Sequence, residues 1–121
     1  MDMKTTVTLK GKEYPLAYTA LAAGIISEKC ARPEKMGEYL QSGSRAERVQ
    51  KVCWILSVLM YAGELYERAE AALEGRERER RPSLKPEDVL GLLKPKDMPK
   101  VVIALGEAIQ KGLCIPDATK K

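Results

Sequence analysis

Acidic residues and cysteines are the side chains that could do chemistry here, because the 121-residue chain contains no histidine. Catalysis by histidine, Ser-His-Asp triads and Cys/His zinc sites are therefore excluded. Glu64, Glu67 and Glu70 are spaced three residues apart, and on a helix this spacing brings carboxylates close enough to bind a hard cation. The same spacing is typical of an ordinary solvated helix face, and we favour that interpretation.

The three cysteines, Cys30, Cys53 and Cys114, are odd in number and far apart. They show no C-x-x-C spacing, so the sequence predicts neither a metal or redox site nor a disulfide framework. We expect reduced thiols, with Cys53 in the core. The glycine-rich phosphate-binding motifs and the G-x-S-x-G motif of hydrolases are also missing from the sequence. We therefore expect a protein that is not an enzyme, with no metal and no cofactor.

Charge gives weak support to nucleic-acid binding. The net charge is +4, but 21 basic and 17 acidic residues are interspersed through most of the chain. The one charge run, Arg76 to Arg81, could bind phosphate, although its glutamates cancel much of the field and favour a solvated linker. Five Tyr, one Trp and no Phe leave few side chains for stacking on bases. Nucleic-acid binding through Arg76 to Arg81 stays as an alternative.

The element that organises the chain is a long helix predicted from Arg45 to Glu74. Ser44 and Glu47 have the S-x-x-E spacing of a capping box, which marks its start. Its middle, residues 52–62, is an apolar run of 11 residues that holds the only Trp. A membrane span needs about 20 such residues, so we expect a buried or partner-covered helix in a soluble protein, with no membrane partner.

This helix carries two apolar stripes on opposite sides. The first stripe consists of Val49, Val52, Cys53, Leu56, Met60 and Gly63. The second consists of Trp54, Ile55, Val58, Tyr61, Ala62, Leu65, Ala69, Ala72 and Leu73. Because the apolar face changes sides, the middle of the helix must be covered on two opposite sides.

The second stripe beyond Gly63 has two interpretations. Either the last two helices of the chain cover it, or it is open to a partner helix or to a second copy. A straight 30-residue helix is about 45 Å long, whereas a globule of this size is about 35 Å across. The helix must therefore bend near Gly63, or its C-terminal half must project beyond the rest of the protein. The candidate partner-binding residues are Trp54, Val58, Tyr61, Leu65, Ala69 and Leu73.

The N-terminal residues 3–17 predict a short β-hairpin. Residues alternate from Thr5 to Leu9, Gly11 supplies a positive φ in the turn, and Pro15 restricts the second strand to an edge. The inward set is Val7, Leu9, Tyr14 and Leu16. Because a lone hairpin is only marginally stable, it must lie on helices.

Residues 19–113 predict a helical body. Thr19 caps a helix from Ala20 to Cys30, with Leu21, Ile25 and Ile26 as its buried line. Further helices run over residues 34–41, from Pro86 to Leu93, and from Met98 to Lys111. The last has a core face of Val101, Val102, Leu105, Ala108 and Ile109, and Gly112 marks its end.

Residues 75–83 form an exposed charged linker and residues 114–121 a mobile tail. The predicted fold is a single mainly α domain of about five helices around one long central helix, with an N-terminal β-hairpin.

Several of these segments together resemble the small tail assembly chaperones of long-tailed bacteriophages. They are Lys10-Gly-Lys-Glu-Tyr-Pro-Leu16 leading into a helix, the Trp-bearing middle helix, Pro86-Glu-Asp-Val-Leu-Gly-Leu-Leu93, and Val101-Val-Ile-Ala-Leu-Gly-Glu-Ala-Ile109. The resemblance is one of pattern and order over residues 4–111, not of an invariant motif. The Arg/Glu run over residues 76–81 departs from the pattern.

The resemblance implies a non-enzymatic chaperone, made from a phage or prophage, that acts in the cytoplasm of the bacterial host. Such a protein binds the tape-measure protein, keeps its long apolar helices from aggregating and helps to recruit tail-tube subunits. The family has no catalytic residues, and a homo-oligomer is compatible with it. The N-terminus has no apolar signal region, which agrees with a cytoplasmic protein. A structural or connector subunit of the phage particle is the other alternative.

Overall fold

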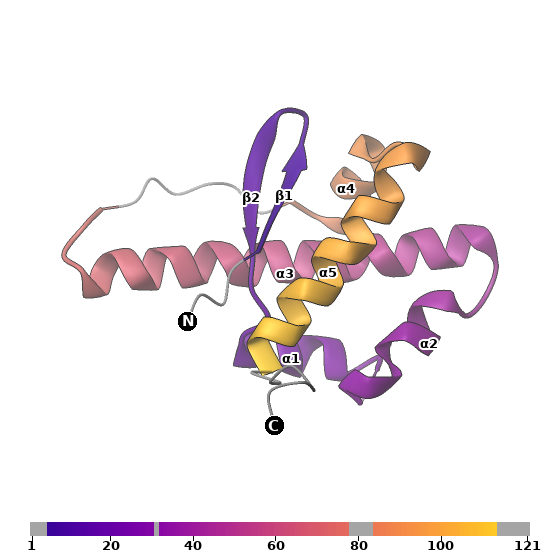
Figure 1. Ribbon diagram of the computed structural model, residues 1–121, viewed down its shortest axis with the longest axis horizontal. Coiled ribbons are helices and arrows are strands. Elements are labelled where there is room, and N and C mark those ends of the chain that lie inside the picture. Colours follow the sequence, from indigo (N-terminus) through magenta and orange to yellow (C-terminus); the bar gives the residue numbers. More distant parts are fainter. Residues whose placement is uncertain (1–4, 31, 78–83, 114–121) are drawn as a thin grey trace, which may run out of the picture.

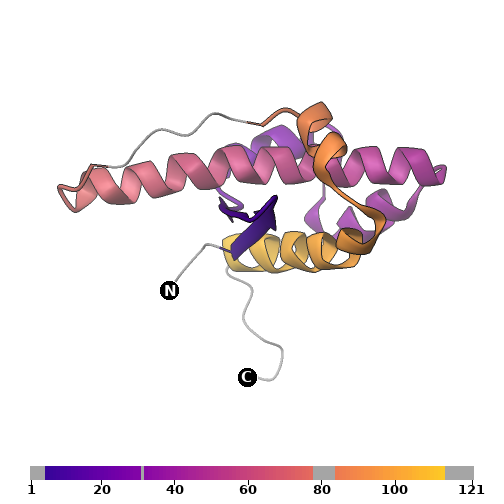
Figure 2. The same cartoon turned by 90° about the horizontal axis from the view of Figure 1, so that it is seen from above.

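The computed structural model describes residues 5–30, 32–77 and 84–113. These residues form one two-stranded hairpin and five α-helices, of which α3, Arg45–Leu73, is by far the longest. Figures 1 and 2 show α3 as a straight rod, with the other elements gathered around its middle and its N-terminal half. The predicted mainly α fold around one central helix, with an N-terminal hairpin, is confirmed. The predicted tail and residues 78–83 of the predicted linker lie outside the described residues.

The hairpin pairs β1, Thr5–Leu9, with β2, Lys12–Leu16, in antiparallel register. Its two-residue turn has positive φ angles at Lys10 (53°) and Gly11 (79°), as a type I′ turn requires. Glycine adopts this conformation without strain, whereas lysine does not. The predicted inward set is confirmed: Val7, Leu9 and Leu16 are buried, and Tyr14 packs against the core.

Strand β2 lies directly on α3, with Gly63 at the crossing. A Cβ atom added to Gly63 would lie 2.1 Å from the carbonyl oxygen of Pro15, so only glycine fits there. Next to this contact, the amide of Ala17 donates to the carbonyl of Leu59 at 3.2 Å. The helix does not bend at Gly63; the glycine allows two backbones to meet instead.

Helix α1, Ala20–Ser27, begins with the predicted cap, in which Thr19 Oγ1 accepts from the amide of Ala22 at 3.4 Å. Its predicted extent to Cys30 and its predicted buried line are wrong in part. Ala22 and Ile26 face the core, whereas Leu21 is 43 % exposed and Ile25 is half-buried. The helix is apolar on nearly every side, so periodicity alone could not select the face that α3 covers.

The second short helix starts later than predicted. Residues Pro33–Lys35 form a 3-10 turn, and α2 extends over Met36–Gln41. Met36 is buried, while Tyr39 and Leu40 are partly buried against the core. All three predicted apolar positions of this helix therefore contribute to packing.

Helices α4, Pro86–Leu92, and α5, Met98–Leu113, are joined by a 3-10 turn over Pro95–Asp97. Asp88 and Asp97 each accept a hydrogen bond from a backbone amide three residues earlier, at 3.0 and 3.2 Å. These bonds satisfy amide groups that have no partner within the helix.

Two predictions for α5 are wrong. Gly112 does not end the helix, which continues to Leu113; a Cβ on Gly112 would lie 2.2 Å from the carbonyl oxygen of Tyr18, so this glycine permits a close contact. Val102 is 43 % exposed, and Ala104 lies in the core instead. The observed core face follows helical spacing: Val101, Ala104, Leu105, Ala108 and Ile109.

The start of α3 is the predicted capping box. The amide of Ser44 donates to the Glu47 carboxylate at 2.7 Å, and the amide of Glu47 donates to Ser44 Oγ at 3.2 Å. The hydrogen bond from the Ser44 backbone is the main reason why the pKa of Glu47 is lowered. The helix ends at Leu73, earlier than predicted, because Gly75 takes a positive φ of 74° and turns the chain away.

Candidate partner-binding surface

Most side chains in the middle of α3 are buried, whereas Trp54 is half-buried and Tyr61 is 41 % exposed. Strand β2 and helices α1, α4 and α5 pack against this part of α3. The prediction that this part of the helix is covered on two opposite sides is therefore confirmed. Burial also raises the pKa of the Cys53 thiol above its ordinary value. The buried residues are Val52, Cys53, Ile55, Leu56, Ser57, Val58, Leu59, Met60, Ala62, Gly63 and Glu64.

The C-terminal end of α3 projects beyond the rest of the body. In Figures 1 and 2 it extends past the hairpin, and no other described helix lies beside it. Helix α4 and the start of α5 lie instead toward the opposite end, where Leu90 and Met98 line hollows together with residues 45–54 of α3. Among the described residues, the last two helices therefore do not cover the second stripe beyond Gly63. We call residues 65–74 the projecting segment.

The first two candidate residues belong to the folded body. Trp54 is half-buried and packs against the core, and the Lys29 ammonium lies 5.4 Å from the centroid of its ring. This distance is within the range of a cation–π contact. Val58 is only 8 % exposed. Both residues support α3, and Val58 offers little surface to a partner.

The other four candidate residues lie along one side of α3. They follow one another at intervals of four residues, so they form a nearly straight line on the helix surface. Tyr61 is 41 % exposed, Leu65 half-buried, Ala69 exposed and Leu73 88 % exposed. Ala71, which lies on another side, is buried. We call Tyr61, Leu65, Ala69 and Leu73 the open stripe.

A hollow of about 520 Å³ lies beside Trp54, between α2, α3, α4 and the turn that follows α1. Lys51 forms one wall: its ammonium donates to the carbonyls of Ser42 at 2.9 Å and Tyr39 at 3.2 Å, and lies 4.8 Å from the centre of the Tyr39 ring. These contacts hold the Lys51 ammonium against the C-terminal end of α2, where the helix dipole favours a positive charge. We therefore interpret Lys51 as structural.

A larger groove, of about 810 Å³, was not predicted from the sequence. It lies between the N-terminal half of α3, the end of α2, and helices α4 and α5. Most of its lining is apolar, and the only charged side chains in the lining are Arg45, Arg48 and Lys94. Its apolar lining consists of Leu40, Val49, Val52, Leu90, Leu93, Pro95, Met98, Pro99, Val102 and Ile103.

One signal for this groove was present in the sequence. Val101, Val102 and Ile103 are consecutive, and three successive side chains on a helix cannot all face one core. Val101 is buried, whereas Val102 and Ile103 are 43 % and 62 % exposed and line the groove. The remaining lining comes from segments far apart in the chain, which periodicity does not bring together.

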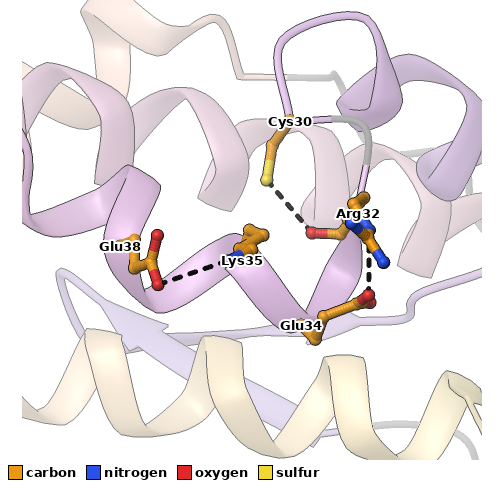
Figure 3. Close-up of polar contacts among 5 residues, drawn as sticks. All are labelled: Cys30, Arg32, Glu34, Lys35 and Glu38. Atoms are coloured by element: carbon orange, nitrogen blue, oxygen red, sulfur yellow. Dashed lines mark hydrogen bonds and ion pairs between the residues drawn. The ribbon is translucent and has the colours of Figure 1, made fainter.

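The polar contacts between α1 and α2 stabilise a turn and do not build a site. Figure 3 shows the Cys30 thiol donating to the carbonyl of Arg32, at 3.4 Å, and ion pairs of Arg32 with Glu34 and of Lys35 with Glu38. Both ion pairs are exposed, and exposed pairs contribute about 0–1 kcal/mol. In the part of the chain that the structure describes, no three metal-ligating side chains gather into a possible metal site.

No described helix is both long and apolar enough to cross a membrane. Comparison of the chain with models of protein families, with curated proteins and with solved structures gave no match. The open stripe and the larger groove are therefore the features from which a function must be argued.

Proposed function

We propose that this protein is a non-enzymatic binding module that captures amphipathic helices, and that it serves as a tail assembly chaperone of a bacteriophage or prophage. The observation that carries the proposal is the open stripe. Four side chains of one helix side extend from the middle of α3 onto its projecting segment, which has no other described helix beside it, and the last of them is a leucine that is 88 % exposed. Apolar lines of this kind bind the apolar face of a partner helix.

The rest of the fold holds this stripe in place. The buried middle of α3 and the contact of β2 at Gly63 fix the helix as one straight element. A surface that is ordered before binding loses little conformational entropy when a partner docks. From Tyr61 to Leu73 the stripe is about 18 Å long, at 1.5 Å per residue. It therefore matches about three turns of a partner helix.

The energy of capture comes from the large apolar side chains of the stripe. Complete burial of such a side chain contributes about 1.5–3 kcal/mol. Tyr61, Leu65 and Leu73 are the three large ones, and Ala69 lets the partner approach closely between them. Trp54 and Val58, included among the sequence candidates, contribute indirectly by holding α3 against α1 and the core.

The identity of the partner is supported by the resemblance to tail assembly chaperones. The hairpin entering a helix, the Trp-bearing central helix and the two closing helices occur in the order that the resemblance requires. The partner would then be the tape-measure protein, whose long apolar helices need protection before the tail tube forms around them. Tail-tube subunits would be recruited to the complex, in the host cytoplasm.

The test is binding to tape-measure segments encoded beside this chain. The purified protein should bind at least one amphipathic segment, and Leu73→Asp should weaken binding by tenfold or more, because a charge replaces an anchor (about 1.4 kcal/mol for each tenfold step). Leu21→Asp is the matched control, since Leu21 is an exposed leucine on α1, away from the stripe. Equal binding by both variants, or no binding to any tape-measure segment, would contradict the proposal.

A further inference from the structure

We propose that the larger groove, between α3, α4 and α5, binds the projecting segment of a second copy of this chain. The groove is an open apolar surface at one end of α3, and the open stripe is an open apolar surface at the other end. Each needs a cover that no described part of the same chain supplies. The groove and the projecting segment also carry opposite net charges.

The lining of the groove defines the chemistry of its occupant. Its apolar residues include Val102 and Ile103, which are 43 % and 62 % exposed. Its three charged residues, Arg45, Arg48 and Lys94, are all cationic, and no carboxylate is part of the lining. An occupant must therefore present apolar side chains to the floor and carboxylates to the edges.

The projecting segment has this chemistry. Residues 65–74 contain three glutamates and one arginine, a net charge of −2, against +3 for the cations of the groove. Leu65, Ala69, Ala72 and Leu73 supply its apolar residues, and the two alanines keep that side narrow. A helix with small residues on its apolar side can lie deep in a groove.

The contact must form between copies. Helix α3 is straight and has 29 residues, so it is about 43 Å long. The groove lies against residues 45–52 and the open stripe extends from residue 61 to residue 73. One chain therefore cannot place its own projecting segment in its own groove. Two copies can bury both kinds of surface, either as a closed pair or as a chain of molecules.

Self-association through the groove does not require a tape-measure partner. It does deepen the proposed function, because the open stripe would be covered by a second copy until a partner helix displaces it. Changes to the groove should therefore affect self-association and leave the partner site intact. A groove variant that still self-associates would therefore count against this proposal alone, whereas loss of tape-measure binding would count against the proposed function.

The experiment measures the mass of the purified protein by sedimentation across a wide range of concentration. The wild-type chain should associate as concentration rises, and salt should weaken the association because the charges are opposite. Ile103→Asp, in the groove, and Leu73→Asp, on the segment, should each remain monomeric. Leu21→Asp and Lys100→Glu, at exposed positions outside both surfaces, should associate as the wild type does.

Mixing the two monomeric variants gives the decisive result. The Ile103→Asp copy keeps its projecting segment and the Leu73→Asp copy keeps its groove, so the mixture should form pairs through one remaining contact. Because both positions are exposed, thermal unfolding should confirm that both variants fold. A wild-type chain that stays monomeric, variants that associate normally, or a mixture that stays monomeric would each overturn the proposal.

Discussion

Replacing Gly63 by alanine should destabilise the protein, although alanine normally favours a helix. The added Cβ would lie 2.1 Å from the Pro15 carbonyl oxygen, and ordinary contact begins at 3.4 Å, so the two backbones must separate by about 1.3 Å. This shift also weakens the hydrogen bond from Ala17 to Leu59, now 3.2 Å. Overpacking costs about 1–3 kcal/mol and the hydrogen bond about 1 kcal/mol. Helix propensity returns at most about 1 kcal/mol.

The expected net loss is therefore about 1–3 kcal/mol in the free energy of unfolding. Urea denaturation followed by the fluorescence of Trp54 measures it directly. Gly106→Ala is the matched control, because Gly106 is also inside a helix but has no atom within 4 Å of the added Cβ. That variant should gain up to about 1 kcal/mol. If Gly63→Ala were as stable as Gly106→Ala, strand β2 would not lie on α3 as described.

Three further predictions concern the turn, the cap and the core. Lys10→Asn should stabilise the hairpin by about 0.5–1 kcal/mol, because asparagine tolerates the positive φ better; unchanged stability in urea would contradict this. Ser44→Ala should cost about 0.5–2 kcal/mol. Because the pKa of Glu47 is lowered in the folded state, the stabilisation from its carboxylate should be complete above the ordinary value of 4.5 and should be lost as the pH falls through the lowered pKa. Glu47→Gln should remove that part of the pH dependence, and an unchanged pH profile would refute the assignment. The Cys53 thiol is buried and has a raised pKa, so alkylation followed by mass spectrometry should modify it only at the rate of unfolding; rapid modification of the native protein would show that it is accessible.

Local signals in the sequence were enough to predict most of the fold. The Ser44 and Glu47 capping box, the Thr19 cap and the alternation of the hairpin are short-range patterns, and the structure contains each of them. Predictions failed where a local pattern had two readings. Gly112 fits a helix end as well as a close contact with the backbone of Tyr18, and only the position of Tyr18 decides between them.

The candidate surface was predictable in outline only. The helical wheel identified the stripe that includes Leu65 and Leu73, because that information is within one helix. It could not show that Val58 is covered while Leu73 is exposed, since this depends on where α1, α4 and β2 pack along α3. The larger groove could not be predicted as a whole, because its lining combines residues from Leu40 to Ile103.

The most direct test of the central claim is photo-crosslinking from position 73 in cells that also make the tape-measure protein. A photoreactive amino acid replaces Leu73 in one version and Leu21 in another, and both positions are exposed. We predict a covalent adduct with a helix of the tape-measure protein from position 73 and none from position 21. Equal adducts from both positions, or no tape-measure adduct from position 73, would contradict the proposal that the open stripe is where this protein binds its partner.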